Sequence, residues 1–416
     1  NREIGSYKDG IYDTLPVKGK DITLTLDAEL QAYGEKLMEH KWGGIVAKEL
    51  YTGEILSLVS APGYDPDLLV GRKRSKNFNK LWYDTIARPL YDRSLQAMYP
   101  PGSPFKTMTA LIALQENVIN TTEGIECHHG FSYGRSSSMK CHGHPSPLSM
   151  EPAIAHSCNT YFGKVYRRII EKYDTPQAGM NAWHDHLASF GLGNFLGNDL
   201  PVGQPGRIPD AEYYNKWYPD NRWQASYTLS NGIGQGEVAT TPIQLANMTA
   251  AIANRGWYYT PHILKKIDDD PLKNPKYTTK NKTTIDPENF EPVVAGMHDV
   301  YNYGTAKFLQ IPGIEICGKT GTAQNFTKID GKKTALTDHS IFVAFAPKDD
   351  PKIAIAVFVE NGYWGARYGG RIATLMIEKY LRDKITRTDL EDWVLSHSLE
   401  EEYAKPYSGK PFNINQ

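Results

Sequence analysis

The sequence predicts a mixed α/β domain whose sheet takes strands from both ends of the chain. Alternating or fully apolar runs typical of strands occur early, within residues 22–59, and late, within residues 341–359. Segments with helical periodicity lie between them, and one of these, at 105–114, is apolar on more than one side, which is typical of a buried helix. Because helices separate the early strands from the late ones, we expect both sets to join one sheet.

Local signals support the separate elements. Asp27 can cap a helix after the first strand. Thr241 with Gln244 three residues later has the pattern of a capping box, and Pro242 suits the first helical position. The expected strands span 22–26, 45–47, 54–59, 341–345 and 353–359, and the expected helices 27–40, 105–114, 151–172, 178–190, 241–252 and 370–381.

Composition excludes several classes of protein. The 416 residues include 46 basic and 47 acidic side chains, for a net charge of −1, which argues against nucleic acid as a partner. Apolar residues make up 40% of the chain, enough for a packed core. The longest apolar runs, such as 353–359, have about seven residues, whereas a membrane-spanning helix needs about 20.

A serine followed three residues later by a lysine opens the buried helix. Pro101 and Gly102 precede Ser103, and Lys106 follows one turn later on the same face. A serine hydroxyl needs a neighbouring base to become a nucleophile, and a lysine can be that base if burial lowers its pKa. By itself the pattern is weak, because Ser103 could be an ordinary helix cap and the same spacing recurs at Ser137 and Lys140.

A second short pattern, Ser157-Cys158-Asn159, lies between two expected helices. It could also be a polar turn without a catalytic role, since Ser and Asn favour turns between helices. The related sequence Ser75-Lys76-Asn77 occurs in a charged loop and shows how little this pattern proves alone.

The third pattern is Lys319-Thr320-Gly321-Thr322, just before the late strands. A lysine and two threonines on one strand could hold a carboxylate, and Gly321 would let a substrate backbone approach closely. The stretch from Gly313 to Thr320 also has the spacing of a phosphate-binding loop. No helix is expected after Thr320, however, so this interpretation is the weaker one.

The three patterns in this order form the signature of penicillin-recognising serine enzymes. The chain resembles the transpeptidase domain of class B penicillin-binding proteins, elongation type, over roughly residues 21–385. The resemblance is carried by 93–106, 230–246 and 318–323. It implies an α/β (α+β) fold with a central antiparallel sheet flanked by helices, and an all-helical subdomain inserted at about 104–250.

The resemblance also implies an activity and the residues that perform it. Ser103 would form an acyl-enzyme on a peptidoglycan stem peptide, and Lys106 would accept its proton. The backbone N–H groups of Ser103 and Thr322 would form the oxyanion hole. The other implied roles are a proton relay for Ser157, positioning of Ser157 for Asn159 and Lys319, and binding of the terminal carboxylate or backbone for Thr320, Gly321 and Thr322.

A cysteine and histidine cluster lies between the first two patterns. Cys127, Cys141, His144 and Cys158 are four soft or borderline ligands suited to tetrahedral zinc, and some relatives of this type bind zinc near this loop. The alternatives are a disulfide between Cys127 and Cys141 and free thiols beside solvated histidines. A zinc ion here is expected to be structural, because Cys158 is the neighbour of Ser157. Cys317 is expected to be a packed strand residue without a role.

The resemblance implies the remaining expectations. Residues 1–20 are expected to be a linker or the remnant of a pedestal, 21–390 the transpeptidase domain, and 391–416 a tail that is frayed from 398 onwards. The protein is expected to be periplasmic and anchored in the inner membrane by a helix outside this chain. Its expected partners are stem peptides, β-lactams, a SEDS-family glycosyltransferase and other elongation-complex proteins. The alternatives are a serine β-lactamase, a D,D-carboxypeptidase and a non-catalytic β-lactam sensor.

Overall fold

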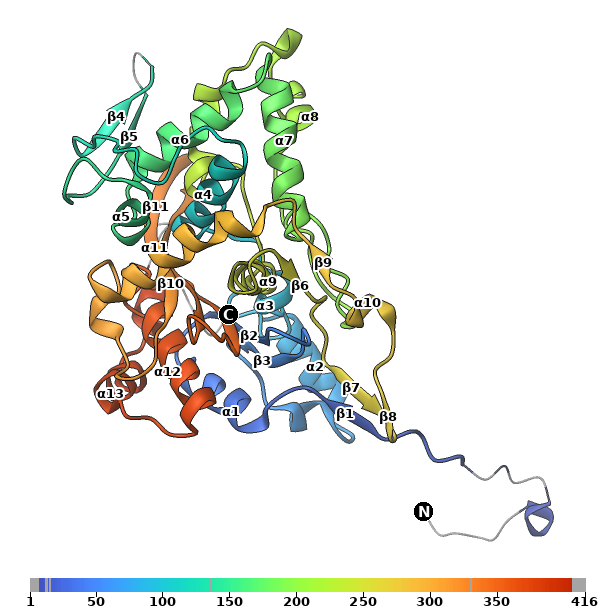
Figure 1. Cartoon of the computed structure of the whole chain (residues 1–416). Coiled ribbons are helices and arrows are strands. Elements are labelled where there is room, and N and C mark those ends of the chain that lie inside the picture. The colour runs from blue at the N-terminus through green and yellow to red at the C-terminus, as the bar shows by residue number, and fades with distance from the viewer. Residues whose placement is uncertain (1–6, 12–13, 15, 135–136, 330, 406–416) are drawn as a thin grey trace.

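A five-stranded antiparallel sheet in the order β10-β11-β12-β2-β3 forms the centre of the molecule. We describe it from a computed structural model, which covers residues 7–11, 14, 16–134, 137–329 and 331–405 (Figure 1). The early hairpin joins the late strands where Ile355 of β12 pairs with Ala47 of β2, which confirms the sheet predicted from both ends of the chain. The strands are β1 (Ile22–Leu24), β2 (Gly43–Glu49), β3 (Ile55–Ala61), β4 (Gly130–Ser132), β5 (Ser138–Lys140), β6 (Trp257–Tyr258), β7 (Leu264–Ile267), β8 (Asp270–Pro271), β9 (Asn281–Lys282), β10 (Cys317–Ile329), β11 (Lys332–Ala346) and β12 (Ile353–Val359).

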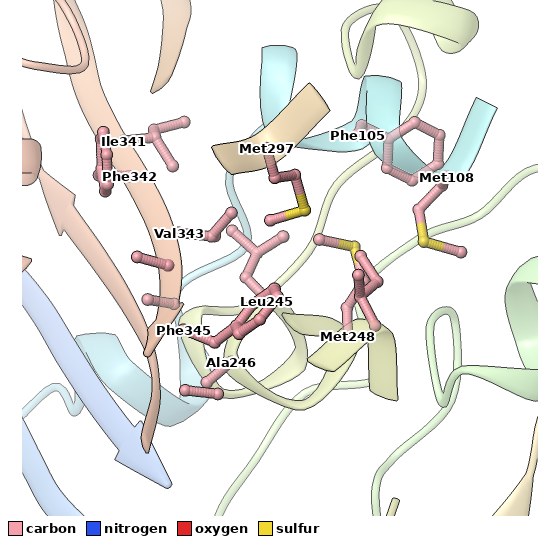
Figure 2. Close-up of a cluster of buried hydrophobic side chains, with 14 of the residues drawn as sticks. Phe105, Met108, Leu245, Ala246, Met248, Met297, Ile341, Phe342, Val343 and Phe345 are labelled. Carbon is pink, nitrogen blue, oxygen red and sulfur yellow. The ribbon is translucent and has the colours of Figure 1, made fainter. Parts of the chain in front are cut away.

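Helices cover both faces of this sheet. Phe342 of β11 lies against Gly369 at the start of α12, and its neighbour Val343 points towards α9 (Figure 2), so these two helices cover opposite faces. Helix α1 packs beside α12, and α11 packs beside α9. The helices are α1 (Ala28–Leu37), α2 (Arg74–Trp82), α3 (Arg93–Gln96), α4 (Lys106–Gln115), α5 (Met150–Ala155), α6 (Asn159–Glu171), α7 (Pro176–Ser189), α8 (Ala211–Asn215), α9 (Pro242–Ala253), α10 (Pro275–Thr278), α11 (Phe290–Asn302), α12 (Gly369–Arg382), α13 (Thr388–Ser396) and α14 (Glu400–Tyr403).

Helix α9 forms the centre of the core. All 12 of its residues are buried, and the predicted capping box is present between Thr241 and Gln244. Its Leu245 and Met248 meet side chains of α4, α11 and β11 in one apolar cluster (Figure 2). Such a helix, buried on all sides, is stable only inside the protein, and here it packs against β2, β11 and β12, next to the strand that carries the third sequence pattern.

The first predicted strand lies outside the central sheet. Ile22–Leu24 forms β1, which pairs with β7 in a small separate sheet that also contains β8. Ile22 and Leu24 stay 64% and 44% exposed, so this strand adds little to the core. No helix of the described ranges is both long and apolar enough to cross a bilayer.

The expectation of a frayed tail from residue 398 onwards is wrong for the part that the structure describes. Helix α14 packs beside the start of β2 and the end of β12, where the Tyr403 ring stacks on Trp42 with centroids 4.0 Å apart. The Tyr403 hydroxyl accepts a hydrogen bond from the Trp42 backbone N–H at 2.8 Å and donates one to the Glu360 carbonyl at 3.0 Å. The polar composition of this segment concealed one large buried side chain. The expectation for 406–416 lies outside the described residues.

Replacing Tyr403 by alanine is therefore expected to destabilise the domain. Loss of a buried aromatic ring costs about 3–5 kcal/mol, and the Trp42 N–H would also lose its partner. Urea unfolding measures the change, with Tyr227→Ala as a control because the Tyr227 side chain is 54% exposed. If both variants unfold at the wild-type midpoint, the C-terminal segment does not contribute to the fold.

Candidate active site

The turn that carries Ser103 is pressed against strand β10. Ser103–Phe105 forms one 3-10 turn leading into α4. Gly102 has φ 61°, and a Cβ on it would lie 3.0 Å from the Thr322 carbonyl oxygen. A Cβ on Gly321 would lie 2.5 Å from Pro104. The structure thus gives Gly321 a packing reason to be glycine, while its contact with substrate stays a prediction.

Lys106 ends in a buried cluster of acceptors beneath this turn. Its Nζ donates to the Ser157 carbonyl at 2.7 Å, to the Ser157 Oγ at 3.2 Å and to the Asn159 Oδ1 at 2.5 Å. The side chain is fully buried, so these three oxygens replace its hydration. The first and second sequence patterns, more than fifty residues apart, are thereby joined at one nitrogen atom.

Burial lowers the pKa values of both Lys106 and Lys319. It lowers the pKa of Lys106 to about 8, although the charges of Cys141 and Cys158 act in the opposite direction. Burial and the nearby charge of Lys106 hold the pKa of Lys319 well below its usual range. A lysine that loses its proton near neutral pH can act as a base.

Ser157 lies at a strained turn between α5 and α6. Its φ is 58°, a left-handed conformation that is uncommon for serine and typical of functional sites. Asn159, the first residue of α6, also donates from Nδ2 to the Lys140 carbonyl at 2.8 Å. The predicted link from Lys319 is absent among the described residues: its Nζ donates to the Thr320 carbonyl at 3.2 Å and bonds neither Ser157 nor Asn159.

A cavity of about 790 Å³ brings the three patterns together. Ser103, Ser157, Asn159, Thr320 and Thr322 line it, while Lys106 and Lys319 are buried behind its wall. The serine and two threonines all line the cavity, so it can hold a carbonyl at the serine and a carboxylate at the threonines.

Four further residues of the site were not predicted. The Thr305 Oγ1 is 2.8 Å from the Thr320 Oγ1, and the Gln235 Nε2 donates to the Thr322 carbonyl at 3.2 Å. Asp338 and Trp364 also line the cavity. Gln235 belongs to a stretch that carried the family resemblance, which was a signal for it. The other three come from segments without any distinctive pattern.

The structure also shows where the competing sequence patterns lie: the two recurrences of the first and second patterns, and the phosphate-loop spacing. Ser75-Lys76-Asn77 lies in α2, which buries none of its residues. Lys140, at the end of β5, lines the cavity by itself without Ser137. Gly318–Thr320 belongs to β10, with no helix after it, so the phosphate-loop interpretation is wrong.

The predicted metal ligands converge beside the Ser157 turn. The Sγ atoms of Cys127, Cys141 and Cys158 and a ring nitrogen of His144 all lie within 4.8 Å of one another. The Cys141 Sγ is 3.4 Å from the His144 Nε2 and 3.9 Å from the Cys158 Sγ. All four cysteines are free, so the disulfide alternative is not observed. Cys317 is buried in β10, apart from this cluster.

Known proteins are similar to this chain in sequence and in fold. Residues 43–381 match the family model of the penicillin binding protein transpeptidase domain. The peptidoglycan D,D-transpeptidase MrdA of Acinetobacter baumannii is 35% identical over 86% of this chain and 53% of its own length. The structure of Pseudomonas aeruginosa PBP2 in complex with WCK 5153 has 33% identity and a TM-score of 0.75, covering 94% of this chain and 83% of that one.

A third similar structure is the complex between penicillin-binding protein PBP2 and MreC from Helicobacter pylori. It has 30% identity and a TM-score of 0.70, and the match covers 86% of this chain and 64% of that one. The chain spans about half the length of the curated relatives that it matches.

The chain belongs to the penicillin-binding-protein transpeptidase family. Within that family it is of class B and of the elongation type, to which the PBP2 proteins belong.

Proposed function

We propose that this chain is a peptidoglycan D,D-transpeptidase that works through a Ser103 acyl-enzyme and is inhibited by β-lactams. The observation that carries this proposal is the buried Lys106 amine, held between the Ser103 turn and the Ser157 hydroxyl. The family and the relatives named MrdA support the same activity.

The first half of the reaction uses the residues around Lys106. The Ser103 Oγ attacks the carbonyl of the penultimate D-alanine, and the neutral Lys106 amine takes the hydroxyl proton. The developing oxyanion is held by the backbone N–H groups of Ser103 and Thr322. When the peptide C–N bond breaks, the leaving amine receives a proton through Ser157, and an ester on Ser103 remains.

The second half reverses these steps with a new amine. The amine of a second stem peptide attacks the ester carbonyl, gives up a proton through the same Ser157 and Lys106 route, and forms the cross-linking amide as Ser103 regains its hydroxyl proton. The Thr320 and Thr322 hydroxyls bind the terminal carboxylate of the donor.

One experiment separates this function from its rivals. The chain is labelled with a fluorescent penicillin, release of the label is followed for hours, and turnover of a stem-peptide thioester is measured. A transpeptidase is expected to keep the label and to turn over the thioester with an amine acceptor. Rapid release without thioester turnover indicates a β-lactamase, and permanent labelling without turnover indicates a sensor. Preference for water over amines indicates a carboxypeptidase.

The rate of acylation is expected to depend on pH through Lys106. The pKa of this lysine is lowered to about 8, so its neutral, basic fraction grows with pH below that value and is nearly complete above it. Acylation by penicillin, measured from pH 6 to 10, should rise with a midpoint near pH 8 and level off above it. A rate independent of pH in this range would contradict Lys106 as the base.

We propose that Cys127, Cys141, His144 and Cys158 hold a structural zinc ion. Tetrahedral zinc, with bonds of about 2.3 Å to sulfur and about 2.0 Å to nitrogen, separates its ligand atoms by about 3.5–3.8 Å. The two distances measured from the Cys141 sulfur, 3.4 and 3.9 Å, are close to these values. The pKa of Cys141 is lowered because the Cys158 thiol donates to it. Bound zinc would stabilise the Ser157 turn, next to Cys158.

Metal analysis tests the zinc proposal. The wild-type chain should contain about one zinc ion, and Cys141→Ala should lose it and melt on the order of 5–10 °C lower, since each kcal/mol shifts Tm by about 2–4 °C in a domain of this kind. Cys317→Ala removes a buried thiol outside the cluster and should keep the zinc. Absence of stoichiometric zinc, or an unchanged Tm in Cys141→Ala, would refute the structural role.

The family membership supports three further proposals. We propose that residues 1–20 are a linker or the remnant of a pedestal, that 21–390 form the transpeptidase domain, with the helical subdomain and the zinc loop at about 104–250, and that 391–416 follow it as a C-terminal segment. We propose a periplasmic location with an inner-membrane anchor. The proposed partners are a SEDS-family glycosyltransferase and other elongation-complex proteins; the complex of the Helicobacter pylori PBP2 with MreC supports the latter.

A further inference from the structure

We propose that Asp338 binds a primary ammonium group of the stem peptide at the end of the cavity beyond Thr322. This inference rests on the proposed transpeptidase function and identifies a part of its substrate. The ammonium belongs either to a side chain of the donor peptide or to the acceptor amine, and the two sources share the same chemistry.

The strand register places the Asp338 side chain on the cavity side of the sheet. Thr322 of β10 pairs with Ser340 of β11, and successive side chains of a strand alternate between its faces. His339 lies on the other face, where its ring is 5.1 Å from that of Phe358. Asp338 therefore shares the face of Ser340 and Thr322, about 7 Å further along the strand, and it lines the cavity.

A β-bulge lies in β11 at the level of Asp338. The pairing of β10 with β11 shifts between Ala323 and Asn325, where Thr337 and Asp338 of β11 lie opposite Gln324 alone. Bulges redirect side chains next to active sites, and Gln324 lines the cavity together with Asp338 and Trp364. The polar groups here lie beyond the two threonines proposed to bind the carboxylate.

Acidic and basic side chains are unequally represented among the residues that line the cavity. Asp338 is the only acidic side chain among the described residues that line it, whereas Lys140 and His142 line its other wall. None of the ion pairs found among the described residues involves Asp338, and no basic side chain is among the groups that shift its pKa. Burial raises the pKa of Asp338, although a backbone hydrogen bond from Asn325 acts in the opposite direction. A bound ammonium would supply the missing partner.

Hydrogen bonds to segments nearer the C-terminus hold the backbone around Asp338 in place. The Tyr363 N–H donates to the Asp338 carbonyl at 2.9 Å. The Thr337 hydroxyl donates to Glu402 of α14 at 2.7 Å, and the Tyr363 hydroxyl donates to the same carboxylate. Asp338 and the segment with Trp364 are thereby tied together by a third element, as expected of a preorganised binding site.

The chemistry of the reaction explains why an ammonium should arrive here. The acceptor attacks with a side-chain amine of a stem peptide, and donor and acceptor peptides in one cell wall have the same composition. The donor therefore carries such an amine too, a few atoms from the carbonyl bound at Ser103. Either amine is cationic before it reacts and needs a carboxylate partner in a cavity whose other charged groups are basic.

The experiment compares ratios of rates in the 416-residue chain. In the donor arm, kcat/KM is measured for a stem-peptide thioester with a free side-chain amine and for the same thioester with that amine acetylated. In the acceptor arm, the acetylated donor is used and the ratio of aminolysis to hydrolysis is measured with an amine acceptor. Active sites are counted by labelling with fluorescent penicillin, so that unfolded protein does not contribute. The variants are Asp338→Asn, Asp338→Ser and Asp338→Glu, and the control is Asp269→Asn, an exposed carboxylate on the β7–β8 turn.

We expect Asp338→Asn and Asp338→Ser to lower one of the two ratios by about tenfold, the typical effect of losing a hydrogen-bonded charge pair. Asp338→Glu should restore part of it, and Asp269→Asn should not change it. A loss in the donor arm assigns the ammonium to the donor, and a loss in the acceptor arm assigns it to the acceptor. Unchanged ratios in both arms would overturn the proposal. A wild-type chain that penicillin does not label would instead refute the proposed function.

Discussion

Replacing Lys106 by alanine is expected to slow acylation by penicillin by about 10²–10⁴-fold, the usual contribution of a positioned general base. The variant loses the amine that takes the Ser103 proton. It also leaves the Ser157 carbonyl and the Asn159 amide oxygen without the donor that joins them. The second-order rate constant with a fluorescent penicillin measures the effect.

The control for the Lys106 variant is the replacement of another buried lysine, Lys48. Lys48 on β2 is also buried, with its Nζ bonded to Asn247 and to the Tyr259 carbonyl, but it lies outside the cavity. Lys48→Met should lower stability while its folded fraction is acylated at the wild-type rate. If the two variants lose acylation equally, the effect reflects the loss of a buried charge and not of a base.

Replacing Gly234 by alanine is expected to reduce acylation by about 10²-fold or more, although Gly234 bears no reactive group. Its φ is 70°, and a Cβ would lie 2.2 Å from the Gly102 carbonyl oxygen and 2.7 Å from the Phe105 Cβ. The Gly102 N–H already donates to the Gly234 carbonyl at 2.8 Å. The added carbon must therefore displace the turn that holds Ser103, and a shift of about 1 Å costs about 10²-fold in rate.

Gly71→Ala is the matched control for this variant. Gly71 has φ 73°, and nothing lies within 4 Å of the position of its Cβ. In both variants an alanine must adopt a positive φ, so the energetic cost to the backbone is the same. The steric clash of the added Cβ is then the difference between them. Acylation should be normal in Gly71→Ala, and a normal rate in Gly234→Ala would show that the turn does not depend on this contact.

The reactive centre could be predicted from sequence because its residues occur in short patterns with fixed spacing. Ser103 and Lys106 are one helical turn apart, and Ser157 and Asn159 flank a tight turn, so local geometry already determines most of their arrangement. The cysteine cluster could be predicted because few other functions explain Cys127, Cys141 and Cys158 beside so many histidines.

The missed residues depend on contacts between distant segments. Asp338 reaches the cavity only because Ser340 pairs with Thr322, and a shift of this register by one residue would turn it to the other face. Thr305 follows α11 and meets β10 only in the folded chain. The C-terminal segment was misjudged because its charges suggested a solvated tail, whereas Leu399 and Tyr403, four residues apart, share a buried helix face.

The formation of an ester on Ser103 is tested most directly by mass spectrometry. The chain is incubated with benzylpenicillin, its intact mass is measured, and the modified peptide is mapped. One penicillin mass is expected per chain, on the peptide that contains Ser103, and none is expected on Ser103→Ala. An adduct on another residue of the wild-type chain, or an undiminished adduct on Ser103→Ala, would contradict the proposed acyl-enzyme.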